Sequence, residues 1–164
     1  MTVVRLGAWC DLVTEEEYRK ALRSLVGVPV EGFEAVSTGV TSDEVRKALE
    51  QFRRGLSFRV QEFATLDDGR RLTLHDERGF GVGGHPASED PWAFLTLAGL
   101  EADVRTTVLP DDDDTGDEHP YEWLAGLLRL HNVEASPDQL RLLPYDVVFS
   151  ERLRARVAGP DSGC

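Results

Sequence analysis

Residues 56–75, LSFRVQEFATLDDGRRLTLH, predict the centre of the fold. Polar and apolar side chains alternate on both sides of residues 67–69, Asp-Asp-Gly. Two alternating runs joined by an Asp-Gly turn are typical of a β-hairpin, in which every second side chain shares a face. Phe58, Val60 and Glu62 are therefore expected on one face of the first strand. The rest of the chain is arranged around this hairpin.

Helices and further strands are predicted on both sides of the hairpin. Thr14 and Glu17 have the spacing of a capping box, which marks the start of a helix, and Ser136 and Gln139 repeat it. Glycines and prolines predict a loop at 79–91. The other expected elements are strands at 2–9, 33–37 and 104–109 and helices at 14–27, 41–54, 88–99, 121–131, 136–143 and 151–157, while 147–149 stays ambiguous.

These elements predict an α+β fold with a mixed or antiparallel sheet, a central hairpin, helices packed on one face and a helical C-terminal region. We expect a single domain over residues 1–157, with its helical subregion at about 118–157, and a disordered tail at 158–164. A chain of 164 residues is long enough to bury a core of its own. The order of the strands does not follow from these patterns.

The composition is typical of a soluble globular protein, with 41% hydrophobic and 29% charged residues. The sequence contains no apolar run of about 18 residues, and its first residues lack the basic and apolar parts of a signal peptide. We therefore expect neither a membrane span nor secretion. Cys10 and Cys164 make no disulfide framework, so a reducing cytoplasm is the expected compartment.

The net charge of −12 is concentrated in one part of the chain. Residues 1–60 and 137–164 each contain equal numbers of acidic and basic side chains, so the whole excess falls within 61–136. A localised acidic region attracts basic partners and disfavours nucleic acids and anionic membranes. We expect the partner to be another protein, basic in charge, and expect no nucleic acid and no membrane as partner.

Residues 111–122, DDDDTGDEHPYE, have the spacing of a calcium loop and are similar to an EF-hand loop. Against this stand Glu118 at a position that is usually apolar, Pro110 where an entering helix would end, and the lack of a second loop. A solvated acidic loop is the alternative, and we favour it. The calcium ligands would be Asp111, Asp113, Thr115 and Glu122.

Several weaker patterns accompany the calcium loop. Residues 79–84 satisfy GxGxxG, but His85 and Pro86 follow where a dinucleotide site needs a helix. Residues 131–140 have the outline of a helix-turn-helix, within a chain too acidic to favour DNA. Cys10 is expected to be a small buried residue and not a nucleophile. A transition-metal site for hydrolysis would use His75, Asp76, His85 and His119, with Asp90 nearby in the sequence.

No motif for catalysis stands out, so we expect a non-enzymatic cytoplasmic protein that binds a protein partner. In size, acidity and single-domain form the chain resembles immunity proteins, inhibitors and adaptors. A metal-binding protein or metal-dependent hydrolase is the alternative, and apart from such a metal we expect no cofactor. Whether Trp123 is exposed or buried stays open. The expected partner-binding residues are Asp111, Asp112, Asp113, Asp114, Asp117, Glu118, Tyr121 and Trp123.

Overall fold

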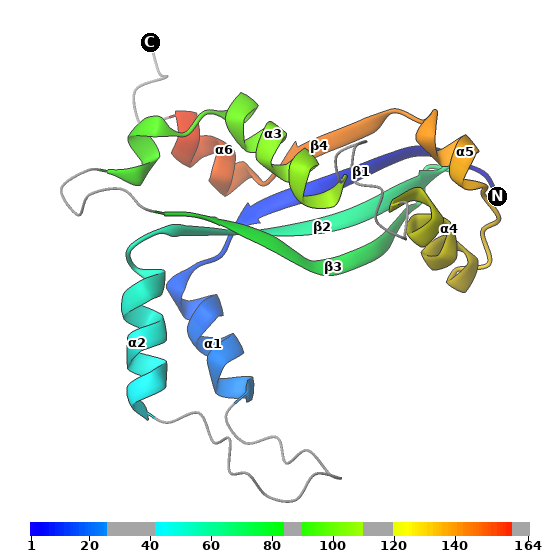
Figure 1. Ribbon diagram of the computed structural model, residues 1–164. Coiled ribbons are helices and arrows are strands. Elements are labelled where there is room, and N and C mark those ends of the chain that lie inside the picture. Colours follow the sequence, from blue (N-terminus) through cyan, green and yellow to red (C-terminus); the bar gives the residue numbers. More distant parts are fainter. Residues whose placement is uncertain (26–41, 84–89, 110–119, 159–164) are drawn as a thin grey trace, which may run out of the picture.

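The computed structural model describes residues 1–25, 42–83, 90–109 and 120–158. Strands and helices alternate irregularly along these ranges (Figure 1). Their bounds, in chain order, are β1 Val3–Leu12, α1 Glu15–Leu25, α2 Ser42–Phe52, β2 Leu56–Leu66, β3 Arg71–Val82, a 3₁₀ helix Pro91–Phe94, α3 Leu97–Val108, α4 Pro120–Leu130, α5 Pro137–Arg141, β4 Tyr145–Phe149 and α6 Glu151–Ala158.

The strands form one mixed sheet in the order β3-β2-β1-β4. β2 and β3 form the predicted antiparallel hairpin, and Gly69 closes its turn with a φ of +83°, a value that glycine adopts without strain. β1 pairs antiparallel with β2 and parallel with β4. Helices α3, α4, α5 and α6 lie on one face of this sheet (Figure 1). The predicted α+β fold with a central hairpin is confirmed.

The hydrophobic core on the helix side of the sheet has two parts. One part, the α3–α6 core, joins the sheet to α3 and α6, and the other, the α4–α5 core, joins it to α4 and α5. The two parts lie over opposite ends of the strands (Figure 1). The α3–α6 core contains Ala8, Cys10, Phe58, Val60, Leu100, Val104, Val108, Phe149 and Leu153, and the α4–α5 core contains Val3, Leu6, Ala64, Leu66, Leu74, Leu124, Ala125, Leu128, Val133 and Leu140.

A buried carboxylate joins four elements at the end of β1. Asp11 is 3% exposed and accepts hydrogen bonds from Ser150 Oγ at 2.5 Å, Arg152 Nε at 2.7 Å and Arg59 at 3.0 Å. Burial alone raises the pKa of a carboxyl, but these bonds outweigh it and lower the pKa of Asp11 to about 2. Arg152 also lies 3.4 Å from Glu17 of α1. The ionised carboxylate therefore holds α6, β2 and the start of α1 against β1.

Helices α1 and α2 form an arm that extends from the sheet on the side away from α3 and α6 (Figure 1). The predicted capping box is present, since Glu17 accepts from the Thr14 N–H at 2.8 Å and donates its own N–H to the Thr14 hydroxyl at 3.2 Å. Tyr18 and Phe52 stack with ring centroids 4.4 Å apart. Glu15 pairs with Arg53 at 2.6 Å. The arm is thus held together by a ring stack and a surface ion pair.

Three of the predicted elements are wrong. In place of the helix predicted at 88–99, the described residues form the 3₁₀ helix Pro91–Phe94, an extended Leu95 and Thr96, and the start of α3. β3 continues through Gly79–Val82, where we predicted a loop, because these residues stay in register with Leu56–Arg59. α3 runs through the predicted strand at 104–109 and past Gly99, which we expected to end a helix. The β-branched residues there favour a strand, but the buried positions of α3 recur every four residues, as on one face of a helix.

The ambiguous segment 147–149 belongs to β4, and the final predicted helix is α6. Ala158, which we assigned to a disordered tail, is the last residue of α6. The predicted strand at 33–37 and the rest of the tail lie outside the described residues. Among the helices that are described, none has the length and apolarity needed to span a bilayer.

Candidate functional site

Most of the residues predicted for partner binding lie outside the part of the chain that the structure describes. These are Asp111, Asp112, Asp113, Asp114, Asp117 and Glu118. Tyr121 and Trp123 lie on α4, are half-buried and pack against the α4–α5 core. The Trp123 ring receives the edge of His75 at 5.0 Å and the Arg78 guanidinium at 5.1 Å. Part of the Trp123 surface is therefore occupied by contacts within the chain.

The predicted metal ligands are likewise only partly described. Asp111, Asp113, Thr115, His85 and His119 lie outside the described residues. Glu122 is exposed on α4 and Asp76 is exposed on β3, whereas His75 is half-buried against Trp123. The described ranges bring no three His, Cys, Asp or Glu side chains into one metal-binding group. The calcium and transition-metal sites stay predictions about the remaining residues.

Two of the weaker patterns can be followed in the structure. Gly79 and Gly81 of the GxGxxG pattern lie inside β3, so they do not form a loop before a helix. Cys10 is fully buried as a free thiol, and burial raises its pKa to about 12. A thiol with so high a pKa forms little thiolate and is a poor nucleophile. Cys10 is the small buried residue that the sequence predicted.

A polar centre lies on the helix-covered face of the sheet and consists of Glu62, His75 and Tyr145. Glu62 of β2 is 1% exposed and lies opposite Ala8 of β1 and His75 of β3. Neither oxygen of this carboxyl receives a hydrogen bond from the described residues, although Arg78 Nε lies 3.6 Å away. Burial raises the pKa of Glu62 to about 7, against the attraction of the Arg78 guanidinium.

The other two members of the polar centre are also unsatisfied. The His75 Nδ1 and the Tyr145 hydroxyl are buried and, within the described ranges, have no hydrogen-bond partner. Burial and the nearby Glu62 both raise the pKa of Tyr145. A carboxyl with a pKa near 7 can exchange its proton at neutral pH, which is a requirement for acid–base chemistry. Yet none of the three side chains lines either of the two clefts at the end of β3.

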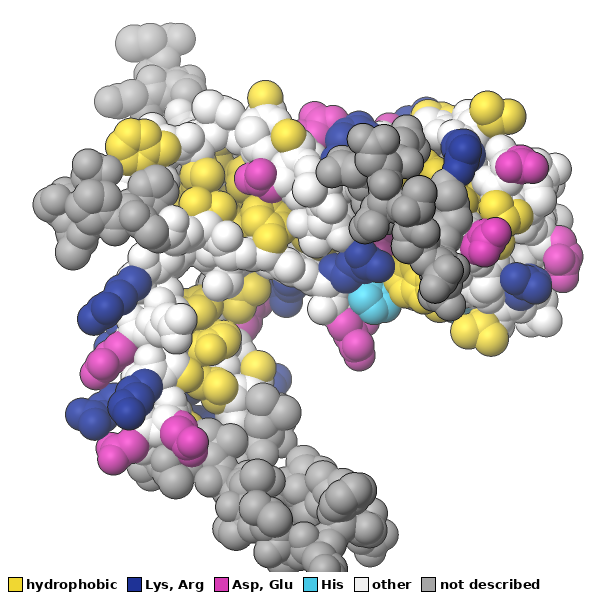
Figure 2. Space-filling model, viewed as in Figure 1, with side chains coloured by type: hydrophobic (Ala, Val, Ile, Leu, Met, Phe, Trp, Pro, Cys, Tyr) yellow, Lys and Arg dark blue, Asp and Glu magenta, His cyan; other side chains and the backbone are white. Residues whose placement is uncertain are grey.

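The arm carries a second candidate site, an apolar surface whose side chains are only half-buried. None of the described residues of α1 or α2 is among the buried hydrophobic residues of the protein. Apolar side chains gather over the arm and continue toward the sheet (Figure 2). An amphipathic helix normally buries its apolar stripe, and an exposed stripe marks a contact surface. The half-buried residues of this arm surface are Tyr18, Leu22, Val45, Ala48, Leu49 and Phe52.

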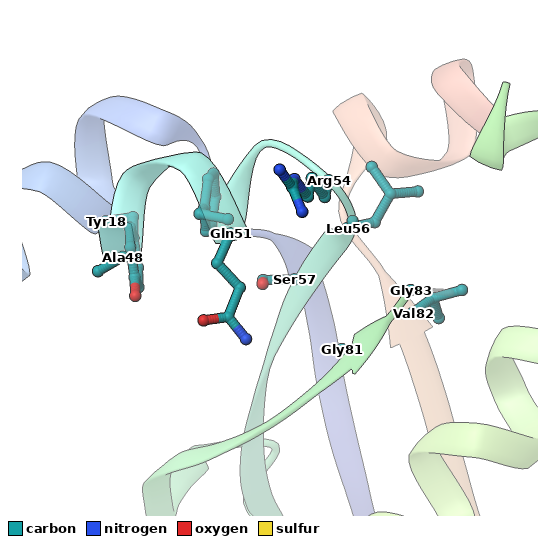
Figure 3. Close-up of a pocket in the computed structure, with 11 residues that line it drawn as sticks. Tyr18, Ala48, Gln51, Arg54, Leu56, Ser57, Gly81, Val82 and Gly83 are labelled. Carbon is teal, nitrogen blue, oxygen red and sulfur yellow. The ribbon is translucent and has the colours of Figure 1, made fainter. Parts of the chain in front are cut away.

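A cleft of about 500 Å³ lies where the arm meets the sheet (Figure 3). We call it the lower cleft. Tyr18, Ala48 and Phe52 contribute apolar walls, and Gln51 extends from α2 alongside the start of β2. The opposite wall is Gly81–Gly83, at the end of β3. The lower cleft therefore combines the ring stack of the arm with exposed strand backbone.

An upper cleft of about 500 Å³ lies on the other side of the same strand end. Its walls are the last residues of β3, from Phe80 onward, and Asp103, Thr106 and Thr107 of α3. Both threonine hydroxyls donate to carbonyls of their own helix, at 3.1 and 2.8 Å. The Asp103 side chain is exposed, which makes it the charged group of this cleft.

Comparison with known proteins adds no family to this description. No family model matches the chain, and neither the curated proteins nor the solved structures contain a significant match.

The sequence did not point to either candidate site. Alternation placed Glu62 on the same face as Phe58 and Val60, and a carboxylate among apolar neighbours was the available signal. The arm surface consists of the apolar stripes of two helices that the sequence predicted at 14–27 and 41–54 and that we expected to pack on one face of the sheet. Only the structure shows that Glu62 is buried and that the apolar stripes of the arm are incompletely buried.

Proposed function

We propose that this chain is a non-enzymatic protein that binds a basic protein partner through the arm surface and the lower cleft. The observation that carries the proposal is the incomplete burial of the apolar stripes of α1 and α2 over their described length, where the apolar side chains are half-buried. Contiguous apolar surface of this kind is uncommon on a monomer that has no partner. The proposal keeps the expected inhibitor-, immunity- or adaptor-type role and the cytoplasmic location.

The net charge of the chain favours a basic partner, while the arm itself lies within residues 1–60, whose charges balance. A net charge of −12 steers basic molecules toward the protein and raises their association rate. The same charge opposes self-association, since a second copy carries it too. The arm itself contributes apolar contacts, which determine how long a complex persists. The negative net charge and the apolar arm surface together favour a basic partner with an apolar anchor residue.

Catalysis is less well supported than binding. The polar centre contains a carboxyl whose pKa is raised, but it lines neither the lower nor the upper cleft. A general acid or base must come within hydrogen-bond distance of its substrate. Glu62 is therefore treated as a determinant of stability, not as a catalytic group.

The proposal is tested with one arm variant and one control. Leu49→Gln makes the arm surface polar, and Leu142→Gln makes the same exchange at a residue that is 85% exposed near the end of α5. Proteins retained from cell extract by the wild-type chain are identified, and the best candidate is purified. Its affinity for each variant is then measured by calorimetry at two salt concentrations, after circular dichroism has shown that both variants fold.

We expect a basic partner whose affinity falls about tenfold or more with Leu49→Gln and is unchanged with Leu142→Gln. The association rate should fall as salt rises. Equal affinities for the two variants would contradict the use of the arm. A wild-type dimer that Leu49→Gln dissociates in sedimentation experiments would show that the arm surface contacts a second copy instead.

A further inference from the structure

The end of β3 has an edge at which backbone groups point away from the sheet. β3 is the outermost strand in the sheet order. Ser57, which lies opposite Gly81, uses its carbonyl to accept the Val13 N–H at 2.8 Å, on the β1 side of β2. The N–H and C=O of one strand residue point to the same side, so both groups of Ser57 point toward β1. Ser57 and Gly81 therefore form a non-hydrogen-bonded pair. Gly81 therefore directs its N–H and C=O outward, and so does Gly79, two residues earlier.

This edge lacks the features that usually protect an outer strand. Irregular pairing interrupts β3 only before Arg78, opposite Val60–Phe63. The charged residues Asp76 and Glu77 also precede Arg78. Bulges and charges of this kind discourage another strand from pairing. Gly79–Val82 has neither, and its glycines allow a second backbone to approach closely.

The two clefts lie on opposite sides of this same strand end. The lower cleft opens toward the arm and the upper cleft toward α3, and residues Gly81–Gly83 line both. In a strand that pairs with an edge, successive side chains point to opposite faces of the sheet. A peptide paired with Gly79–Val82 would therefore direct its side chains alternately into the two clefts.

The linings of the clefts differ in chemistry and indicate which side chains suit each. The upper cleft carries the Asp103 carboxylate, which within the described ranges has no ion pair. A lysine or arginine side chain suits this position. The lower cleft has the Tyr18–Phe52 stack as a wall, which suits an apolar side chain. The matching ligand alternates basic and apolar residues.

We propose that an extended, alternately basic and apolar segment of the partner adds as an extra strand to the outer edge of β3 at Gly79–Val82, which pairs with no other described strand. The inference rests on the proposed function, because it states the form in which the basic partner is recognised. Main-chain hydrogen bonds supply binding and the two clefts supply selectivity, as in other cases of strand addition. A second copy of this chain is the competing occupant, and its Asp103 and its net charge of −12 oppose it.

The probe, which we call the alternating peptide, is an end-capped peptide of four Lys-Val repeats that carries fluorescein. It is titrated with the full chain at low salt, and binding is measured by fluorescence anisotropy. A block peptide, with all of its lysines before all of its valines, keeps the charge and composition but loses the alternation. An acidic peptide of four Glu-Val repeats keeps the alternation and reverses the charge. We expect the alternating peptide to bind at least fivefold more tightly than either control peptide.

Two protein variants test the backbone pairing. Gly81→Pro removes one outward N–H without touching the β2 ladder, and Gly81→Ala keeps that N–H. The added Cβ of Gly81→Ala meets nothing closer than the Leu56 carbonyl oxygen at 3.6 Å, an ordinary contact. We expect Gly81→Ala to bind the alternating peptide like the wild type and Gly81→Pro to lose about five- to tenfold, the effect of one hydrogen bond.

The charge of the upper cleft is tested by reversal. Asp103→Lys should weaken binding of the alternating peptide and strengthen binding of the acidic peptide, so that the preference between the two changes sign. If Gly81→Pro does not fold, the wild-type chain is titrated with versions of the alternating peptide that are methylated on every second amide nitrogen. Methylation of one set should then abolish binding and methylation of the other should be tolerated.

Equal binding of the alternating and block peptides, or of Gly81→Pro and Gly81→Ala, would overturn the inference. If such a result accompanies a partner that still needs Leu49, the strand addition is wrong and the proposed function stands. If the partner is insensitive to Leu49→Gln as well, both are wrong. A dimer that Gly81→Pro converts to monomer would assign the edge to a second copy and would also overturn the proposal.

Discussion

Ionisation of Glu62 should make the protein less stable as pH rises. The folded state holds the proton of Glu62 more tightly than the unfolded chain does, because burial raises its pKa from an ordinary value of 4.5 to about 7. Between those values the folded state binds one proton more than the unfolded state, so the free energy of unfolding falls as pH increases. Below the lower value this contribution is complete, and above the upper value it is lost.

The size of the effect follows from the pKa shift. Each pKa unit corresponds to about 1.4 kcal/mol, so the loss between pH 4.5 and pH 7 is about 3 kcal/mol, as an order of magnitude. No discount for solvent screening applies, since Glu62 is 1% exposed. A loss of that size is a large fraction of the stability of a typical domain. Glu62→Gln replaces the carboxyl with a neutral group of similar shape and should abolish the dependence.

The assay compares urea unfolding of the wild type and Glu62→Gln at several pH values from 4.5 to 8, monitored by tryptophan fluorescence. The difference in unfolding free energy should shift by about 3 kcal/mol in favour of the variant as pH rises. Glu77→Gln, at an exposed position of β3, controls for the loss of one negative charge. Parallel curves for the wild type and Glu62→Gln would refute a buried carboxyl with a raised pKa.

Three further predictions concern stability. Because the pKa of Asp11 is lowered to about 2, Asp11→Asn should remove about 2 kcal/mol of stability that the wild type has above pH 4 and loses below it, as acid unfolding curves would show. Gly7→Ala should lower the free energy of unfolding by about 1–3 kcal/mol, because the added Cβ would lie 2.5 Å from the Asp146 carbonyl oxygen. Gly126→Ala, at an open position of α4, should raise the free energy of unfolding by about 0.5–1 kcal/mol, and thermal unfolding measures both effects. Calcium should change the melting temperature of neither the wild type nor Glu122→Gln. A saturable rise with calcium that occurs in the wild type alone would establish the calcium loop.

Local rules predicted the elements whose determinants are close in sequence. The Asp-Gly turn fixed the hairpin, and the side chains of Thr14 and Ser136 cap their helices as the spacing indicated. The strand predicted at 104–109 failed where local rules conflict, because Val104 and Val108 satisfy both strand propensity and the helical spacing that begins at Leu100. Burial of that helical face against the sheet stabilises the helix over the strand at these residues.

The sites could not be predicted from the sequence, because they depend on contacts between distant segments. The exposure of Glu62 depends on helices that follow it in the chain, and its pKa depends on that exposure. The edge at Gly79–Val82 exists because the glycines pair with β2 instead of forming a loop. The sequence predicts turn residues at these glycines, and their pairing with β2 can be predicted only when the neighbouring strand is known.

Arg78 connects the polar centre to the proposed binding edge. Its Nη1 donates to the Thr107 carbonyl of α3 at 2.8 Å, while its Nε lies 3.6 Å from Glu62. Thr107 also lines the upper cleft, and Gly79 follows Arg78 directly in β3. A single guanidinium therefore holds α3 beside the edge strand and also limits the rise in the pKa of the Glu62 carboxyl. An apolar residue at this core-facing position would pack against the sheet equally well but could do neither, which accounts for an arginine between Glu62 and α3.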